Sequence, residues 1–528
     1  MRTRLRLVVL LAALWLDAPA VAAQAPALAV VIAIDQLTNE RLTDALSGGL
    51  GRLVHNGRRF MNSSLDHGLT NTCPGHASLI TGMQPGRAGI PGNTYVDREN
   101  WRTRYCVEDD DPAHRVLGGT DGRSPGLLKV DGLGDWLKAA DPARRVFSVG
   151  GKDRSSIMMG GRAPDGAYWF DADQAVFTTS GYYTREMPAY LKAFNSTLAG
   201  RLPARWEHAA GSHRVDDFPG ESEENGRVSG HPLAAGEEAG RQISQSPYLD
   251  EITLDLAQAL VVSEQLGSGD SLDLLAVSLS ATDTVGHLYG PFSAEAEDAL
   301  RRLDFRLGEF LDFLDRRIGS DRYVVALSSD HGITELPEWT LARGVNRCPV
   351  PGSRMSIWRL LAGVYGRIYW RHTFPFDAPT ELVQFGDGQV YVNPAYVAQE
   401  NLDAEAVLAS LIEILESTPG VMKAWTLAEL EKSQDEVARL LHNSVVPGVS
   451  GDLFLQLHPD CIIGDEGTTH GSVYAQDRSV PVLFYGAGVS AGKDLTPAHS
   501  IDLAPTLADL LGIETPAGLD GRVLELNP

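Results

Sequence analysis

Five short apolar runs rich in β-branched residues recur along the chain, at 29–34, 145–151, 272–280, 323–329 and 480–486. Continuous apolar runs of this length are typical of parallel strands that are buried on both faces. The segments between them are long enough for helices, and residues 294–317 carry the apolar stripe of an amphipathic helix. The alternation predicts an α/β fold with a mostly parallel central sheet flanked by helices.

Polar side chains stand where four of these runs end. Asp35 follows the first run, Lys152 the second, Asp283 the third, and Asp330 with His331 the fourth. In open parallel sheets the ligands bind beyond the carboxyl ends of the strands. We therefore expect these five side chains to meet at one edge of the sheet.

Residues 69–93 read LTNTCPGHASLITGMQPGRAGIPGN and contain a short predicted helix that closes on Gly82. Proline just inside a helix start and glycine just past its end favour this assignment. The pattern puts Thr72 at or just before the helix N-terminus, where backbone N–H groups and the helix dipole favour an anion. Thr72 is then either a helix cap or a nucleophile held beside a phosphate group.

Two further histidines complete a set of candidate metal ligands, His287 in TDTVGHLYG and His470 in TTHG. Taken alone, each aspartate can be a helix cap and each histidine part of a turn. Three carboxylates and three histidines together suit zinc, and two mixed sets of this kind suit a two-metal site.

With these motifs the chain resembles the alkaline phosphatase superfamily, in particular its threonine-nucleophile members of the PafA type. The resemblance runs from about Ala29 to the C-terminal segment HSIDLAPTLADLLGIETPAGLDGR. It implies two Zn²⁺ ions per chain, with a phosphoryl-binding asparagine in IPGN and a lysine–arginine pair in GGKDRSS. The site residues that it implies are Asp283, His287 and His470 for one zinc, Asp35, Asp330, His331 and Thr72 for the other, and Asn93, Lys152 and Arg154 for the phosphoryl oxygens.

The function that the resemblance implies is an alkaline phosphatase that hydrolyses phosphate monoesters through a phosphothreonine at Thr72. A phosphodiesterase or nucleotide pyrophosphatase of the same superfamily is the alternative. Nucleotide diesterases typically place an aromatic residue after the nucleophile, whereas this chain has Cys73. A sulfatase is disfavoured because TCPGHA lacks the C/S-x-P-x-R motif, and a non-catalytic binding protein because every ligand position is filled.

The first 23 residues have the pattern of a secretory signal peptide, with Arg2, Arg4 and Arg6 before a short apolar run. We therefore expect a periplasmic or secreted protein without a membrane span. Four cysteines allow three pairings of two disulfides, of which we expect Cys73–Cys106 and Cys348–Cys461.

The net charge of −24 disfavours nucleic acid as a main partner. Small-molecule phosphate monoesters are the expected partners, and we expect a monomer. The absence of a clear linker predicts one catalytic domain over 24–528, with insertions around 95–140, 157–250 and 333–450.

Overall fold

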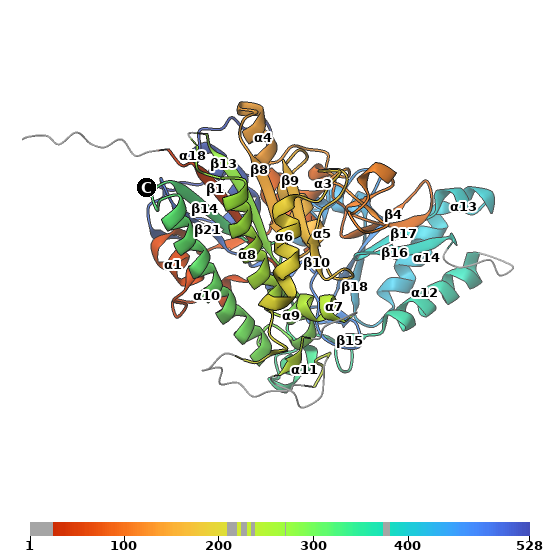
Figure 1. The fold of residues 1–528 in the computed structure, drawn as a ribbon. Coiled ribbons are helices and arrows are strands. Elements are labelled where there is room, and N and C mark those ends of the chain that lie inside the picture. Colours follow the sequence, from red (N-terminus) through yellow and green to blue (C-terminus); the bar gives the residue numbers. More distant parts are fainter. Residues whose placement is uncertain are drawn as a thin grey trace, which may run out of the picture.

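The structure is a computed structural model that describes residues 25–208, 219–222, 230–233, 238–269, 271–372 and 381–527. The predicted signal peptide lies outside the described residues. The centre of the fold is a nine-stranded sheet (Figure 1). In spatial order its strands are β10 (Val176–Thr178), β9 (Gly166–Asp171), β8 (Val146–Gly150), β13 (Asp273–Leu279), β1 (Leu28–Ile34), β14 (Tyr323–Ser328), β21 (Val482–Gly486), β2 (Arg58–Phe60) and β22 (Gly492–Asp494).

The middle of this sheet is parallel. Strands β9, β8, β13, β1 and β14 all run in the same direction, whereas β10 and β21 pair antiparallel to their neighbours β9 and β14. Four of the five apolar runs form parallel strands, and the fifth forms the antiparallel strand β21. The predicted α/β class with a mostly parallel centre is confirmed.

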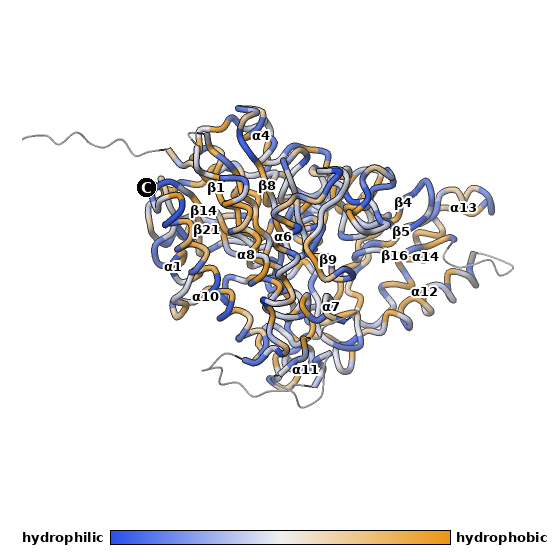
Figure 2. The backbone as a smooth tube through the Cα atoms, in the orientation of Figure 1, coloured by the Kyte–Doolittle hydropathy of each residue, from blue (hydrophilic) through white to orange (hydrophobic). Residues whose placement is uncertain are grey.

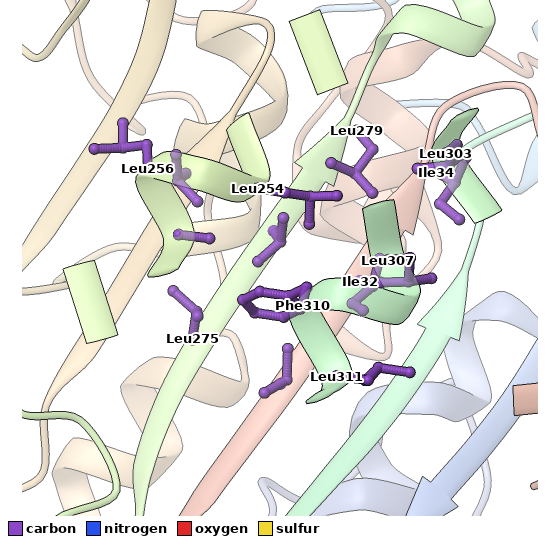
Figure 3. Packing of buried hydrophobic residues seen from close by; sticks show 14 of the residues in the cluster. Ile32, Ile34, Leu254, Leu256, Leu275, Leu279, Leu303, Leu307, Phe310 and Leu311 are labelled. Carbon is purple, nitrogen blue, oxygen red and sulfur yellow. The ribbon is translucent and has the colours of Figure 1, made fainter. Parts of the chain in front are cut away.

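Strand β1 shows how the sheet is buried on both faces. Its residues Leu28, Val30, Ile32 and Ile34 point into one core cluster, and Ala29, Val31 and Ala33 point into the other. Figure 3 shows Ile32 beside Leu307 and Phe310, and Ile34 beside Leu303. Both clusters are closed by helices. Those on the first face are α1 (Gly49–Asn56), α6 (Ala189–Leu198), α8 (Tyr248–Ser263) and α10 (Ala294–Arg317), and those on the second are α2 (Thr72–Thr81), α4 (Leu133–Ala140), α5 (Asp153–Gly160) and α18 (Leu503–Leu510).

A second lobe lies beside the central sheet, on the right in Figure 1. Its four-stranded antiparallel sheet has its own apolar cluster and falls largely within the predicted insertion around 333–450. Its elements are the strands β16 (Val383–Gly386), β17 (Gln389–Val392), β19 (Leu453–Leu457) and β18 (Val421–Thr426), and the helices α12 (Ile357–His372), α13 (Pro394–Gln399), α14 (Ala404–Glu416), α15 (Leu427–Lys432) and α16 (Glu436–His442).

Five short two-stranded sheets complete the strands of the described residues. They pair β4 (Thr94–Asp97) with β5 (Arg102–Tyr105), β6 (Glu108–Asp109) with β7 (Gly122–Arg123), β11 (Arg205–Trp206) with β12 (His231–Pro232), β15 (Arg354–Met355) with β20 (Ile462–Ile463), and β3 (Ser63–Ser64) with β23 (Ala498–His499). The remaining α-helices are α3 (Pro85–Ala88), α7 (Ala239–Ser244), α9 (Ala281–Tyr289), α11 (Pro337–Ala342) and α17 (Ala475–Arg478).

Both expected disulfides form, Cys73–Cys106 and Cys348–Cys461. The first ties α2 to the segment after β5, and the second lies within the second lobe and its edge. Figure 2 shows hydrophobic residues gathered in the interior around β1 and β8. Within the part of the chain that the structure describes, no helix combines the length and apolar character needed to cross a bilayer.

Candidate active site

The candidate active site lies at the carboxyl edge of the parallel strands. Asp35 follows β1, Asp330 and His331 follow β14, and Lys152 follows β8. Asp283 stands in the first turn of α9, directly after β13. The register aligns Ile34 with Leu279 across β1 and β13, so these ends stop at the same level. The expected meeting of five polar side chains is therefore observed.

Asp283, His287 and His470 form the first cluster of candidate metal ligands. The ligand atoms of the three residues all lie within 4.8 Å of one another. His287 Nε2 lies 3.2 Å from Asp283 Oδ1, and His470 Nε2 lies 3.9 Å from the same oxygen. Asp283 and His287 are one helical turn apart on α9, whereas His470 comes from the loop before α17.

The second cluster lies around Asp35, Asp330, His331 and Thr72, all of them fully buried. His331 Nε2 lies 3.1 Å from Asp330 Oδ2 and 3.5 Å from the hydroxyl oxygen of Thr72. The rings of His331 and His470 stack with their centroids 3.5 Å apart, which places the two clusters side by side.

The three histidines share one orientation. Each donates from Nδ1 to a backbone carbonyl, His287 to Thr468 at 2.7 Å, His470 to Thr70 at 2.7 Å and His331 to Gly332 at 2.9 Å. An Nδ1 that donates in this way leaves Nε2 as the nitrogen that binds a metal, and such contacts are the usual support of metal-binding histidines. The arrangement fits a metal centre with Nε2 ligands.

His76 is a fully buried histidine at the same site, which the sequence analysis did not single out. It lies one turn after Thr72 on α2, with Nδ1 2.9 Å from the Thr72 carbonyl and Nε2 3.1 Å from Ser278 Oγ. It also lies 3.3 Å from Asp35 Oδ1 and 3.4 Å from Asp330 Oδ2. Because both ring nitrogens already have protein partners, His76 suits a positioning role between the two carboxylates.

Lys152 and Arg154 bring positive charge to the site from the start of α5. Lys152 Nζ lies 3.0 Å from Asp35 Oδ2 and also bonds to Asp283 Oδ2. Arg154 points Nη2 at the Thr72 hydroxyl, 3.4 Å away, while its Nη1 donates to the Tyr105 hydroxyl at 3.2 Å. Tyr105 in turn donates to Asp153 at 2.6 Å and so fixes the guanidinium.

Asn93 borders the same site. Its Oδ1 accepts a hydrogen bond from the backbone N–H of Cys73 at 2.8 Å, so its position is tied to the first turn of α2. Its own N–H donates to Asp387 Oδ2, and Thr94 N–H donates to the same oxygen at 3.0 Å. Asp387 comes from the turn between β16 and β17, so the second lobe helps to hold Asn93 in place.

The charges at the site perturb one another. Burial alone favours neutral Asp283, but His287 and Lys152 outweigh it and hold the pKa of Asp283 well below its ordinary value. For His331, burial lowers the pKa, and the adjacent Asp330 overcomes this and raises it to about 9. The pKa of Asp330 falls to about 2, because His331 and His76 outweigh the effect of burial. The site therefore holds anionic carboxylates in the protein interior.

These buried anions fit a pair of divalent cations. Charges are costly to bury unless they are paired or coordinate a metal. Asp330 Oδ2 is buried and accepts no hydrogen bond within the described residues, although two imidazoles lie near it. The donor set of carboxylate oxygens and imidazole nitrogens is that of zinc sites.

A cavity of about 450 Å³ opens beside the site. Asn71, Asn93 and His470 line its inner end, and Leu457 and Tyr474 are among its apolar walls. A small organic group fits in a space of this size and character.

The structure brings together all ten sequence-predicted site residues, but their roles as ligands and catalysts stay predictions. The supporting residues His76, Tyr105 and Asp387 were not predicted. His76 had a signal in sequence, because i and i+4 share a helix face with Thr72. Tyr105 and Asp387 had no signal in the sequence, because they are distant from their partners along the chain. They reach the site from a hairpin and from the second lobe.

Fold and site together define an α/β protein with two clusters of Asp and His side chains beside a buried hydroxyl at a helix start. The model of the type I phosphodiesterase / nucleotide pyrophosphatase family matches residues 29–469. The chain belongs to this family.

Several relatives that match over most of their length carry the name alkaline phosphatase. The chain is 32% identical to alkaline phosphatase PhoK of a Sphingomonas species, over 96% of this chain and 92% of the relative. It is 33% identical to alkaline phosphatase PhoD of Zymomonas mobilis, over 95% and 88% of the two chains. The crystal structure of alkaline phosphatase PafA superposes with a TM-score of 0.86 at 28% identity and covers 95% of this chain and 99% of that one.

Proposed function

We propose that this protein is an exported, zinc-dependent alkaline phosphatase that hydrolyses phosphate monoesters through a phosphothreonine at Thr72. The observation that carries the proposal is the position of the Thr72 hydroxyl, 3.5 Å from His331 Nε2 and 3.4 Å from Arg154 Nη2. Relatives of about the same length named as alkaline phosphatases support the reaction class.

The residues that would hold zinc are Asp283, His287 and His470 on one side and Asp35, Asp330, His331 and Thr72 on the other. Bound zinc supplies Lewis-acid stabilisation of developing negative charge and lowers the pKa of hydroxyl groups and water. The rest of the reaction falls to the protein's own side chains.

In the proposed reaction Thr72 attacks phosphorus. Its oxygen forms a bond to phosphorus while the bond from phosphorus to the ester oxygen breaks, and the alcohol leaves with a proton. Water then attacks the phosphothreonine, which restores the hydroxyl and releases phosphate.

Arg154, Lys152 and Asn93 would bind the non-bridging oxygens. The guanidinium is fixed by Tyr105 and the asparagine by Cys73 N–H and Asp387, so both are held in position before substrate arrives. Phosphoryl transfer asks mainly for positioning and charge stabilisation, which pre-organised donors provide.

Charge favours monoesters over diesters. A monoester dianion gains from two nearby cationic side chains, whereas a diester carries one charge less and a second organic group. Cys73 is buried in its disulfide and offers no aromatic surface for a base. The matching family model is named for phosphodiesterases, so hydrolysis of phosphodiesters is the alternative function.

Comparing 4-nitrophenyl phosphate with bis(4-nitrophenyl) phosphate tests the choice. A larger kcat/KM for the monoester supports the proposal, and a larger value for the diester favours the alternative. Metal analysis of the active protein should show zinc in the site, and a chelator should abolish turnover.

A further inference from the structure

A third group of metal-binding side chains lies outside the candidate active site. His208, His231 and Glu295 place their ligand atoms within 4.8 Å of one another, as closely as Asp283, His287 and His470 do in the active site. All three side chains are at least nine-tenths buried, and Glu295 is fully buried. No part of the proposed phosphatase reaction uses them.

Two separate elements build this group. His231 begins β12, which pairs antiparallel with β11 so that Trp206 faces His231, and His208 follows two residues after Trp206. Glu295 stands in the first turn of α10. The group therefore joins the β11–β12 hairpin to the long helix that covers the central sheet.

The distances are those of a site that can close around one ion. His231 Nε2 lies 3.2 Å from Glu295 Oε1, and His208 Nε2 lies 3.9 Å from the same oxygen. Ligand atoms of a tetrahedral zinc site lie about 3.3 Å apart, given bonds of about 2.0–2.1 Å to the metal. His208 must move closer to Glu295 to reach this geometry.

The surroundings orient His231. The Tyr289 hydroxyl lies 3.5 Å from its Nδ1, and the imidazole packs against the Trp206 ring with centroids 5.0 Å apart. Its Nε2 is thereby turned toward Glu295. As in the active site, Nε2 faces the cluster and Nδ1 faces a different neighbour, which here is a hydroxyl group and not a backbone carbonyl.

The carboxylate needs a cation. Among the described residues the ion-pair neighbours of Glu295 are these two histidines, and no described lysine or arginine pairs with it. Its second oxygen, Oε2, is buried and accepts no hydrogen bond from the described residues. The nearby Arg302 binds Asp298 instead, at 2.7 Å. Bound through both oxygens, Glu295 completes four donor atoms from three side chains.

We propose that His208, His231 and Glu295 bind a third divalent transition-metal ion of the zinc class, which fastens the β11–β12 hairpin to α10. The site is structural and independent of the phosphatase chemistry. Tyr289, which contacts His231, is the last residue of α9.

The test is the zinc content of the full protein, measured after dialysis for the wild type, His231→Ala and Glu295→Gln. Glu297→Gln, a more exposed position on the same turn of α10, and His55→Ala, an exposed histidine, are the matched controls. We expect the two site variants to lose one ion per chain and the two controls to lose none. The Asp283→Ala/His470→Ala variant has a disabled active site. Adding Glu295→Gln to this variant should lower its zinc content by one ion per chain.

Two further measurements keep the proposal falsifiable if a variant folds poorly. Zinc anomalous scattering from crystals of the wild-type protein should give a peak between His208, His231 and Glu295. Glu295→Gln should keep monoesterase kcat/KM within about twofold of the wild-type value. A chelator should lower the melting temperature of the wild type by removing metal from both the third site and the active site. In Glu295→Gln the chelator should lower the melting temperature only by the part that is due to the active site. Equal zinc in wild type and both site variants, or no anomalous peak at this place with zinc present, would overturn the proposal. Neither result bears on the active site.

Discussion

The Cα of Gly75 packs against the backbone carbonyl of Asp330, so that a methyl group on Gly75 would lie 2.2 Å from that oxygen. This contact sets how closely the start of α2, with Thr72, approaches the strand end that carries Asp330 and His331. Glycine is required here for close approach and not for an unusual backbone angle. The distance between the Thr72 hydroxyl and the Asp330 carboxylate thus depends on the absence of a side chain at Gly75.

Gly75→Ala should therefore damage the site more than the fold. The methyl group cannot be accommodated without moving α2 away from Asp330, so we expect kcat/KM for 4-nitrophenyl phosphate to fall by at least about tenfold, by analogy with other small displacements at catalytic sites. Gly366→Ala is the control, because the space around Gly366 is open. A Gly75→Ala enzyme with wild-type kinetics would show that the close approach has no catalytic value.

Lys152 and Arg154 should matter more for monoesters than for diesters. Removing one pre-organised donor to a transition state costs about 10²–10³ in rate, and we expect a loss of this size for 4-nitrophenyl phosphate in Lys152→Ala and in Arg154→Ala. The loss for the bis-ester should be much smaller. Arg162→Ala, which removes an arginine that pairs with Asp131 near the surface, should leave both substrates unaffected. Equal losses on the two substrates would mean that the pair only supports the structure.

Removal of the two disulfides should have different effects on activity. Each closes a long loop, with a sequence separation of 33 from Cys73 to Cys106 and of 113 from Cys348 to Cys461. Chain-entropy arguments give about 3–5 kcal/mol of stabilisation for loops of this size. Only Cys73–Cys106 adjoins Thr72 and Tyr105, so the Cys73→Ser/Cys106→Ser pair should lower both melting temperature and kcat. The Cys348→Ser/Cys461→Ser pair should lower melting temperature alone. Loss of activity from the second pair would contradict this assignment.

His67 should make the protein sensitive to acid. Burial lowers its pKa from 6.5 to about 3, and neither ring nitrogen hydrogen-bonds within the described residues. His67 is therefore neutral in the folded state. The stability that depends on a neutral His67 is fully present above pH 6.5 and is lost as the pH falls from 6.5 toward 3, because protonation favours the unfolded state. Between pH 7 and pH 5 the loss amounts to about 2 kcal/mol.

His67→Leu removes the imidazole whose protonation destabilises the folded state. The free energy of unfolding of the variant minus that of the wild type should therefore be about 2 kcal/mol larger, in favour of the folded variant, at pH 5 than at pH 7, as measured by denaturant titration at both values. Leu69→Val, a neighbouring buried change without a titrating group, should shift stability equally at both. A pH-independent difference for His67→Leu would show that His67 does not carry the acid sensitivity.

The parallel core of the fold and the meeting of the predicted site residues were accessible from the sequence. Strands β1, β8, β13 and β14 are buried on both faces, so they leave continuous apolar runs, and parallel pairing carries Asp35, Lys152, Asp283 and Asp330 to one edge. The predicted helix after Thr72 also forms, with Gly82 as its left-handed C-cap at φ 65°.

What the sequence did not reveal depends on contacts between distant segments. The sheet of the second lobe has half-buried strands such as Val383–Gly386, whose pattern is weak. Asp387 reaches Asn93 from the tip of that hairpin, and Tyr105 reaches Arg154 from another. His208, His231 and Glu295 stand far apart in the chain and belong to no recognisable motif, so only the folded hairpin on α10 shows that they meet.

The central claim is that the Thr72 hydroxyl is the group that attacks phosphorus. Rapid acid quenching of the enzyme during turnover of a ³²P-labelled monoester, followed by peptide mapping, tests it directly. We expect label on a single peptide as phosphothreonine at Thr72, and none in Thr72→Ala, which should retain its fold while losing turnover. Label on another residue, or continued turnover by Thr72→Ala, would contradict the account.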